Sequence, residues 1–183
     1  MWTDDNSQGS PLFNIQVFLD LDGVMFDFDK RKREILGRET KEGDNQIWDE
    51  LSKHPHLFKE LELMPDARVL FDYLMSHFSQ TIAILTAIPR AKSFPFAAED
   101  KKASVAQHLS TTLHVETCYA VEKQNYAKTK IKPLLIDDNV KNIAQWSNQG
   151  GIGVYHVSAE ETIACLEWFR KTNPTLWALW SGK

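Results

Sequence analysis

Short apolar runs that end in polar residues divide the chain into a regular alternation of elements. Between these runs, apolar side chains recur at helical spacing over residues 66–78, 100–109 and 140–148, and Ser158 can cap a further helix that begins at Ala159. The runs themselves have the length of buried strands and lie at residues 15–19, 82–85, 115–121, 134–136 and 152–157. Strands that alternate with helices pair in parallel, so the pattern predicts a three-layer, Rossmann-like α/β sandwich.

One segment interrupts this alternation. Residues 27–65 follow the first strand, carry apolar side chains at helix-like spacing, and lead back to the regular pattern only at residue 66. An insertion at the carboxyl end of a strand would lie over the edge where open α/β sheets bind ligands. We therefore expect a small helical cap over residues 27–65, a core of residues 15–26 and 66–183, and a flexible leader of residues 1–14.

Composition narrows the class of partner. The 21 basic and 25 acidic residues give a net charge of −4, which argues against a nucleic-acid polymer, since phosphate backbones require basic surfaces. A small phosphorylated substrate needs only one local basic site. Neither a signal peptide nor an apolar run of membrane-spanning length is visible, so the expected location is the cytoplasm, with no membrane partner.

The first predicted strand ends in two carboxylates, Asp20 and Asp22, followed by Gly23. Burying two like charges at one strand–loop junction is unfavourable unless a cation or a basic group neutralises them. Mg²⁺ does this with oxygen ligands, and a substrate phosphate can complete its coordination shell. An ordinary acidic turn is the alternative, but the preceding apolar run and the Gly-Val that follows favour a functional site.

A second acidic pair, Asp137 and Asp138, ends the fourth predicted strand and is followed by Asn139. Capping of the next helix is an alternative role for Asp138 or Asn139. Two acidic pairs on two strands of one sheet nevertheless predict a Mg²⁺ site of four carboxylates. Whether Asp137 or Asp138 binds the metal directly remains open.

Candidates for holding phosphate follow the second and third strands. The hydroxyl of Thr86 and the backbone N–H groups of Thr86 and Ala87 can bind a phosphate oxygen. A lysine after the third strand would offset the charges of the carboxylates and the phosphate. Lys123 follows that strand directly and Lys128 is the alternative, although either lysine alone also fits a solvated surface position.

The order Asp20-x-Asp22, Thr86, lysine and Asp137-Asp138 resembles the four motifs of the haloacid dehalogenase-like phosphatases. A narrower resemblance, over residues 15 to 157, is to the 5'(3')-deoxyribonucleotidases. It rests on Asp20-Leu21-Asp22-Gly23-Val24-Met25-Phe26-Asp27-Phe28, Ile47-Trp48, the segment from Leu57 to Pro65, Thr86-Ala87-Ile88-Pro89-Arg90, and Leu135-Ile136-Asp137-Asp138. Ala87 departs from the pattern, because characterised members often carry serine there.

The resemblance implies a phosphoric monoester hydrolase. Asp20 would attack phosphorus and form an aspartyl-phosphate, while Asp22 would protonate the leaving alkoxide and later activate water. Asp20, the backbone carbonyl of Asp22, and Asp137 or Asp138 would bind Mg²⁺.

The same resemblance implies a (deoxy)nucleoside monophosphate as substrate. Phe28, together with Trp48 and Phe58, would pack against the nucleobase, and Arg90 would contact the phosphate or a ribose hydroxyl. The three aromatic side chains fit ordinary packing of the cap equally well, and Arg90 fits a solvated surface position.

Other functions stay open at this point. They are a phosphatase of a sugar phosphate or another small metabolite, a glycosyltransferase that uses Asp-x-Asp for a metal–nucleotide complex, and a non-catalytic binding module. Trp168, Trp177 and Trp180 either dock the C-terminal segment onto the helical layer or form a homodimer contact.

Overall fold

A parallel sheet forms the centre of the protein. The computed structural model describes residues 15–40, 46–89, 94–129 and 131–182, and within these ranges five strands pair in the order β3-β2-β1-β4-β5. All four pairings are parallel. The strands are β1 (Val17–Leu19), β2 (Ile82–Ala87), β3 (Val115–Cys118), β4 (Leu134–Asp137) and β5 (Ile152–Tyr155).

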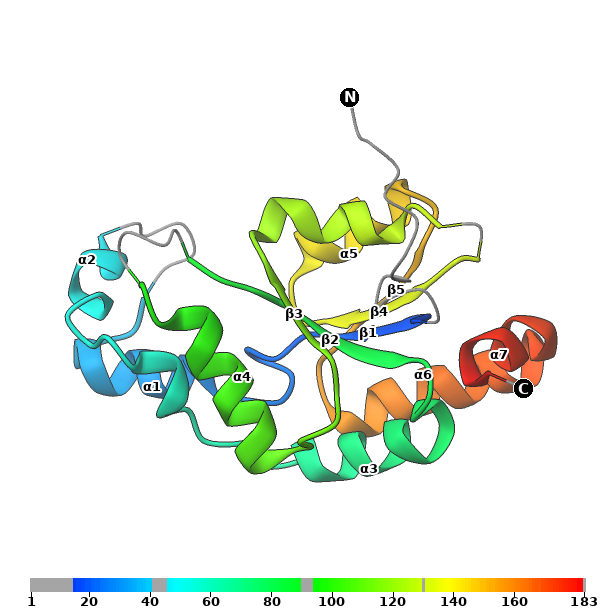
Figure 1. The fold of residues 1–183 in the computed structure, drawn as a ribbon, viewed down its shortest axis with the longest axis horizontal. Helices are drawn as coiled ribbons and strands as arrows, with labels where there is room; N and C mark the ends of the chain where they lie inside the picture. The colour runs from blue at the N-terminus through cyan, green and yellow to red at the C-terminus, as the bar shows by residue number, and fades with distance from the viewer. Residues whose placement is uncertain (1–14, 41–45, 90–93, 130, 183) are drawn as a thin grey trace, which may run out of the picture.

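Helices cover both faces of this sheet, which confirms the predicted α/β sandwich (Figure 1). One face carries α3 (Ala67–Phe78) and α6 (Ala159–Thr172), with α7 (Pro174–Ser181) beside them. The other face carries α5 (Val140–Asn148) and the 3₁₀ segment η2 (Ala120–Ala127).

Successive side chains of a strand point to opposite faces of the sheet, which explains why the core has two layers. Val17 and Leu19 belong to the large apolar cluster shared with α3 and α6, whereas Phe18 between them packs with Leu135 and Trp146 in a separate cluster under α5.

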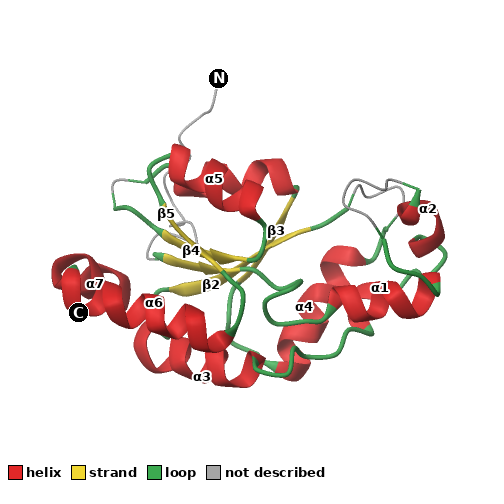
Figure 2. Ribbon diagram, turned by 180° about the vertical axis from the view of Figure 1, so that it is seen from behind, coloured by secondary structure: helices red, strands yellow, loops and turns green. Residues whose placement is uncertain are grey.

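The segment between β1 and α3 forms α1 (Phe28–Leu36), α2 (Ile47–Leu51) and the 3₁₀ turn η1 (Leu57–Lys59), which lie to one side of the sheet near α4 (Ala97–His108) (Figure 2). Its two connections to the rest of the chain are hydrogen-bonded to each other: Asp27 N–H donates to Glu62 C=O (2.8 Å), and Met64 N–H donates to Met25 C=O (2.9 Å). The division into core and cap stays a prediction.

Several element ends differ from the expectation by one to three residues, and one helix was not expected. β3 ends at Cys118 rather than at residue 121, because the Glu122 carboxylate accepts from Tyr119 N–H (3.0 Å) and starts η2. Helix α4 begins at Ala97, three residues early, and α7 was not predicted, although Pro174 occupies its first turn, a favourable position for proline.

The C-terminal tryptophans separate into two environments. Trp177 and Trp180 are buried, and Trp180 Nε1–H donates to Lys132 C=O (2.9 Å), which docks α7 onto the core. Trp168 is 57% exposed, and a homodimer contact there stays a prediction. Among the described helices, none combines the length and the apolar character that crossing a membrane requires.

Candidate active site

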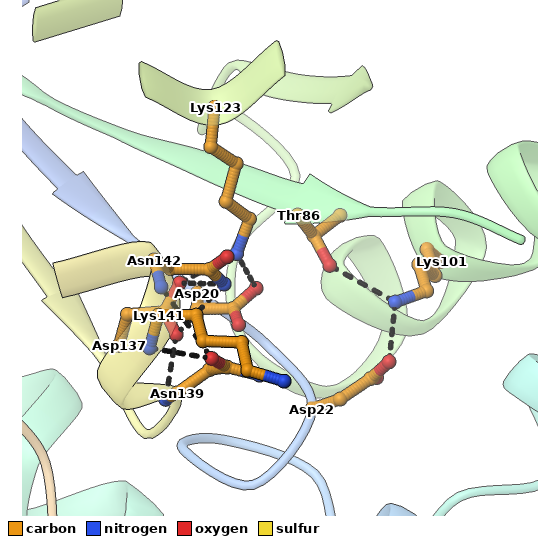
Figure 3. A network of polar contacts seen from close by, with 9 residues as sticks. All are labelled: Asp20, Asp22, Thr86, Lys101, Lys123, Asp137, Asn139, Lys141 and Asn142. Carbon is orange, nitrogen blue, oxygen red and sulfur yellow. Dashed lines mark hydrogen bonds and ion pairs between the residues drawn. The ribbon is translucent and has the colours of Figure 1, made fainter. Parts of the chain in front are cut away.

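Three neighbouring strands bring their polar carboxyl ends together. Asp20 directly follows β1, Thr86 is the second-last residue of β2, and Asp137 ends β4. Strands β2 and β4 lie on either side of β1. Because the strands are parallel, these three side chains meet at one edge of the sheet (Figure 3). All three residues are buried.

Lys123 is the cation at the centre of this edge. Its Nζ lies 2.8 Å from Asp20 Oδ1 and 2.7 Å from Asp137 Oδ2, and the residue is 1% exposed. Burial alone would lower the pKa of the Lys123 ammonium, but the charges of Asp20 and Asp137 outweigh it and raise that pKa. Lys128, the alternative, is exposed and donates to Asn125 Oδ1 (3.3 Å). The structure therefore brings Lys123, and not Lys128, to the site.

Asp137 is fixed by further donors. The Asn142 side-chain amide donates to both of its carboxylate oxygens (3.1 and 2.9 Å), and Asn139 N–H donates to Oδ1 (2.8 Å). Burial, followed by the charge of Asp20, raises the pKa of Asp137 to about 6. The Asn139 side chain caps α5 by accepting from Lys141 N–H (2.9 Å), so the capping role considered for this position is present as well.

Asp138 completes a cluster of carboxylates. One oxygen from each of Asp20, Asp137 and Asp138 lies within 4.8 Å of the others. Residue Asp138 is exposed, yet its carboxyl group lies against Gly23: a Cβ added there would be 1.9 Å from Asp138 Oδ2. Partial enclosure, and then the charges of Asp20 and Asp137, raise the pKa of Asp138 to about 7.

These oxygen donors fit a divalent cation. Three carboxylates face a single buried ammonium, Lys123, so negative charge remains in excess. Carboxylate oxygens are hard ligands and therefore suit a hard cation such as Mg²⁺. A softer metal would favour sulfur or imidazole ligands.

Asp22 points to a different partner. Its Oδ2 accepts from Lys101 Nζ at 2.6 Å, and the same ammonium donates to Thr86 Oγ1 at 2.9 Å (Figure 3). Burial raises the pKa of the Asp22 carboxyl, although Lys101 acts in the opposite direction. The Asp22 side chain is therefore outside the carboxylate cluster, which contains three of the four carboxylates expected there, because Lys101 holds the fourth.

The candidate aromatic residues adjoin Lys101, whose ammonium lies 4.7 Å from the centroid of the Phe58 ring. The Phe28 ring stacks against Phe58 (centroids 5.8 Å, 9° between planes) and against Trp48 (6.1 Å, 21°). Phe94 contacts both Trp48 (5.7 Å) and Phe58 (5.9 Å) edge-on. We call Phe28, Trp48, Phe58 and Phe94 the aromatic cluster. Phe58 and Phe94 are buried, whereas Phe28 and Trp48 are partly exposed.

The remaining predicted contacts are near the same edge or are not described. Ala87 ends β2 next to Thr86. Arg90 lies outside the described residues.

Sequence reasoning missed two side chains of the site, Lys101 and Asn142. A signal for Lys101 was present, because it lies four residues after Ala97 and four before Val105, on the face of α4 that these two apolar residues share. Asn142 likewise lies four residues before the buried Trp146 in α5, on the face that packs against the sheet.

Comparisons with solved structures give only distant similarities. A haloacid dehalogenase-family hydrolase from Deinococcus radiodurans, with bound phosphate and sodium, is 13% identical (TM-score 0.49, covering 86% of this chain and 97% of that one). The L-2-haloacid dehalogenase of Xanthobacter autotrophicus is 14% identical (TM-score 0.47, 90% and 87%). A haloacid dehalogenase-superfamily hydrolase of subfamily IA from Geobacter sulfurreducens is 16% identical (TM-score 0.43, 84% and 97%). Similarities at these scores carry no argument about this chain.

No curated protein matches the sequence. The family of 5' nucleotidase, deoxy (pyrimidine), cytosolic type C proteins matches residues 39–165, which is more than half of the chain. The matched range contains the positions of Thr86, Lys123 and Asp137, and begins after Asp20 and Asp22. This match confirms the expected family and the expected class of enzyme, a phosphatase-type hydrolase. The chain belongs to the 5' nucleotidase, deoxy (pyrimidine), cytosolic type C family.

Proposed function

We propose that the protein is a Mg²⁺-dependent phosphomonoesterase that hydrolyses (deoxy)nucleoside monophosphates through an aspartyl-phosphate on Asp20. One observation carries this proposal: a buried carboxylate, Asp20, lies between a buried ammonium, Lys123, and a second acid, Asp22, at the edge where three parallel strands end. A nucleophile, a cation for the phosphate and a proton donor are thereby gathered at one place.

In the first half of the reaction, an Asp20 carboxylate oxygen attacks phosphorus. The bond from phosphorus to the ester oxygen breaks, and the leaving alkoxide takes a proton from Asp22. The raised pKa of the Asp22 carboxyl favours the protonated form that this step needs. Lys123 and the Thr86 hydroxyl bind the phosphoryl oxygens, which gain charge in the transition state.

In the second half, water attacks the same phosphorus and gives a proton to Asp22. The bond between phosphorus and the Asp20 oxygen breaks, which releases inorganic phosphate and restores both carboxyl groups. Asp22 thus serves first as an acid and then as a base.

Asp20, the backbone carbonyl of Asp22, and Asp138 or Asp137 would hold Mg²⁺. Asp137 already accepts three hydrogen bonds besides its ion pair with Lys123, whereas no side chain among the described residues donates to Asp138, so we assign the direct contact to Asp138. When bound, the metal supplies positive charge that stabilises the phosphoryl oxygens.

The substrate class is inferred from the family description and from the aromatic cluster. Phe28 and Trp48 are the partly exposed members and would contact the nucleobase, while the buried Phe58 supports Phe28 from behind. Stacking on these rings removes the flat face of a nucleobase from water, which stabilises the bound base as it does in proteins that bind single-stranded nucleic acids.

The test is phosphate release from a substrate panel. Purified protein with Mg²⁺ is assayed against deoxynucleoside and ribonucleoside monophosphates and against sugar phosphates. Asp20→Asn serves as the blank, and Asp72→Asn, a change at an exposed acid on α3, is the matched control. We expect release from nucleotides that EDTA and Asp20→Asn abolish and Asp72→Asn leaves intact. Release from sugar phosphates alone would contradict the substrate, and release that survives Asp20→Asn would contradict the mechanism.

A further inference from the structure

We propose that Lys101 is a positioning residue for this reaction: it aims the Asp22 carboxyl at the leaving group and sets the direction in which the Thr86 hydroxyl donates. The inference rests on the proposed function and adds a residue to it. Lys101 comes from α4, which contributes no other group to the site described above.

The environment of Lys101 is unusual for a lysine. Only 1% of it is exposed, and its ammonium has three partners: Asp22 Oδ2 at 2.6 Å, Thr86 Oγ1 at 2.9 Å and the face of the Phe58 ring, 4.7 Å from the centroid. A buried ammonium is unfavourable unless it is paired and hydrogen-bonded, and here each of its neighbours offers negative charge or electron density. The fold therefore uses a buried cation to hold two side chains of the site.

Lys101 orients the Asp22 carboxyl by binding only one of its two oxygens. Lys101 holds Oδ2, while Oδ1 is buried and has no hydrogen-bond partner among the described residues. A buried oxygen without a partner is unfavourable in the protein alone. Because Lys101 fixes Oδ2, the other oxygen, Oδ1, is free to carry the proton that goes to the leaving oxygen of the substrate. The leaving oxygen is then the hydrogen-bond partner that Oδ1 lacks in the protein alone.

The effect on Thr86 follows from the chemistry of the ammonium, which donates and never accepts. Thr86 Oγ1 must therefore accept from Lys101, so the hydroxyl hydrogen is left to donate elsewhere. A phosphate oxygen is an acceptor only, which makes this the orientation that phosphate binding needs.

The contact with Phe58 joins this arrangement to the aromatic cluster. The Phe58 ring contacts both the Lys101 ammonium and the Phe28 ring, and Ser104 on α4 donates to Phe58 C=O (3.1 Å). Helix α4 thus supports both the proton donor and the proposed base-binding rings from one side.

The test compares two leaving groups. A nucleoside alkoxide needs a proton as it leaves, whereas p-nitrophenolate leaves without one, so only the first depends on a well-placed Asp22. We would measure kcat/KM for a deoxynucleoside monophosphate and for p-nitrophenyl phosphate in Lys101→Met, Lys101→Arg and Lys102→Met. Methionine retains the length and apolar character of the buried stem, and Lys102 is the exposed neighbour on the same helix.

We expect Lys101→Met to lower kcat/KM for the nucleotide by about tenfold or more beyond its effect on p-nitrophenyl phosphate, within the range that general acid catalysis contributes. Lys101→Arg restores part of the difference, and Lys102→Met changes neither substrate. Added to Asp22→Asn, Lys101→Met lowers kcat/KM for the nucleotide by no more than it lowers kcat/KM for p-nitrophenyl phosphate in the wild-type background, because only the effect through Thr86 is then left.

Equal losses on the two substrates in folded Lys101→Met would show an effect on phosphate binding alone, which overturns the inference that Lys101 positions Asp22 and leaves the proposed function standing. If Lys101→Met does not fold, as judged by circular dichroism, Lys101→Arg decides: a loss that is larger for the nucleotide supports the inference and an equal loss overturns it. Wild-type protein that hydrolyses neither substrate would refute the proposed function and, with it, this inference.

Discussion

Gly23 offers a direct test of the carboxylate cluster, because its lack of a side chain leaves room for Asp138. Its φ of +76° is in the left-handed region, and a Cβ there would be 1.9 Å from Asp138 Oδ2. Gly23→Ala should therefore have two effects: backbone strain and displacement of the Asp138 carboxylate. Gly37→Ala is the matched control, since Gly37 has a φ of +63° at the C-terminus of α1 and nothing within 4 Å of the added Cβ.

The two effects have different magnitudes and different assays. A left-handed alanine loses about 1–2 kcal/mol of stability at either position, which urea unfolding of the metal-free proteins measures. Asp138 is exposed and can turn away, so the stabilities of the two variants should be similar. Its loss from the cluster removes one carboxylate from a proposed Mg²⁺ site, and one unit charge about 4 Å away contributes several kcal/mol even at an effective dielectric constant of about 20. Titration calorimetry should find Mg²⁺ binding at least about tenfold weaker in Gly23→Ala than in Gly37→Ala.

Asp138→Asn should reproduce the weaker Mg²⁺ binding without the backbone strain. If Gly23→Ala binds Mg²⁺ as tightly as Gly37→Ala does, the displaced Asp138 carboxylate is not a ligand of the metal.

Further predictions concern the charges of the site and the aromatic cluster. Lys123→Met leaves Asp20 and Asp137 buried without their cation, and should lower the metal-free free energy of unfolding by about 3–5 kcal/mol; added Mg²⁺ should restore part of this in urea titrations, and an unchanged midpoint would contradict the pairing. The pKa values of Asp137 (about 6) and Asp138 (about 7) lie above the 3.8 of an unfolded aspartate, so the native state holds more protons. Their contribution to metal-free stability is therefore complete below about pH 4 and is lost as the pH rises to about 7; this pH dependence should flatten in Asp138→Asn, and an unaltered slope would contradict it. Trp48→Leu should raise KM for nucleotides while leaving kcat/KM for p-nitrophenyl phosphate unchanged, and an equal effect on both substrates would argue against base contact.

Much of the fold could be predicted because the local signals agree with the tertiary structure. Helix α5 has the predicted bounds, residues 140–148, since Asn139 caps it and Gly150 follows with a left-handed φ of +93°. Ser158 caps α6 as expected, accepting from Glu161 N–H (3.2 Å). The predicted end of β3 was wrong because the strand pattern continues through residues 119–121. In the structure, the Glu122 carboxylate accepts from Tyr119 N–H and starts the 3₁₀ segment there instead.

The acids of the site could be predicted because they follow strands directly, where position along the chain determines position in space. Lys123 and Lys101 differ from them, because each reaches the site from a helical segment whose placement depends on packing. Lys123 was found through its distance from a strand, but sequence reasoning treated Lys101 as part of an ordinary helix. In the structure, the ammonium of Lys101 enters the site because Ala97, Ser104 and Val105 bury the same face of α4. A lysine at helical spacing from apolar residues such as Ala97 and Val105 is therefore a signal in its own right: once buried, its ammonium needs an acidic partner, and here that partner is Asp22.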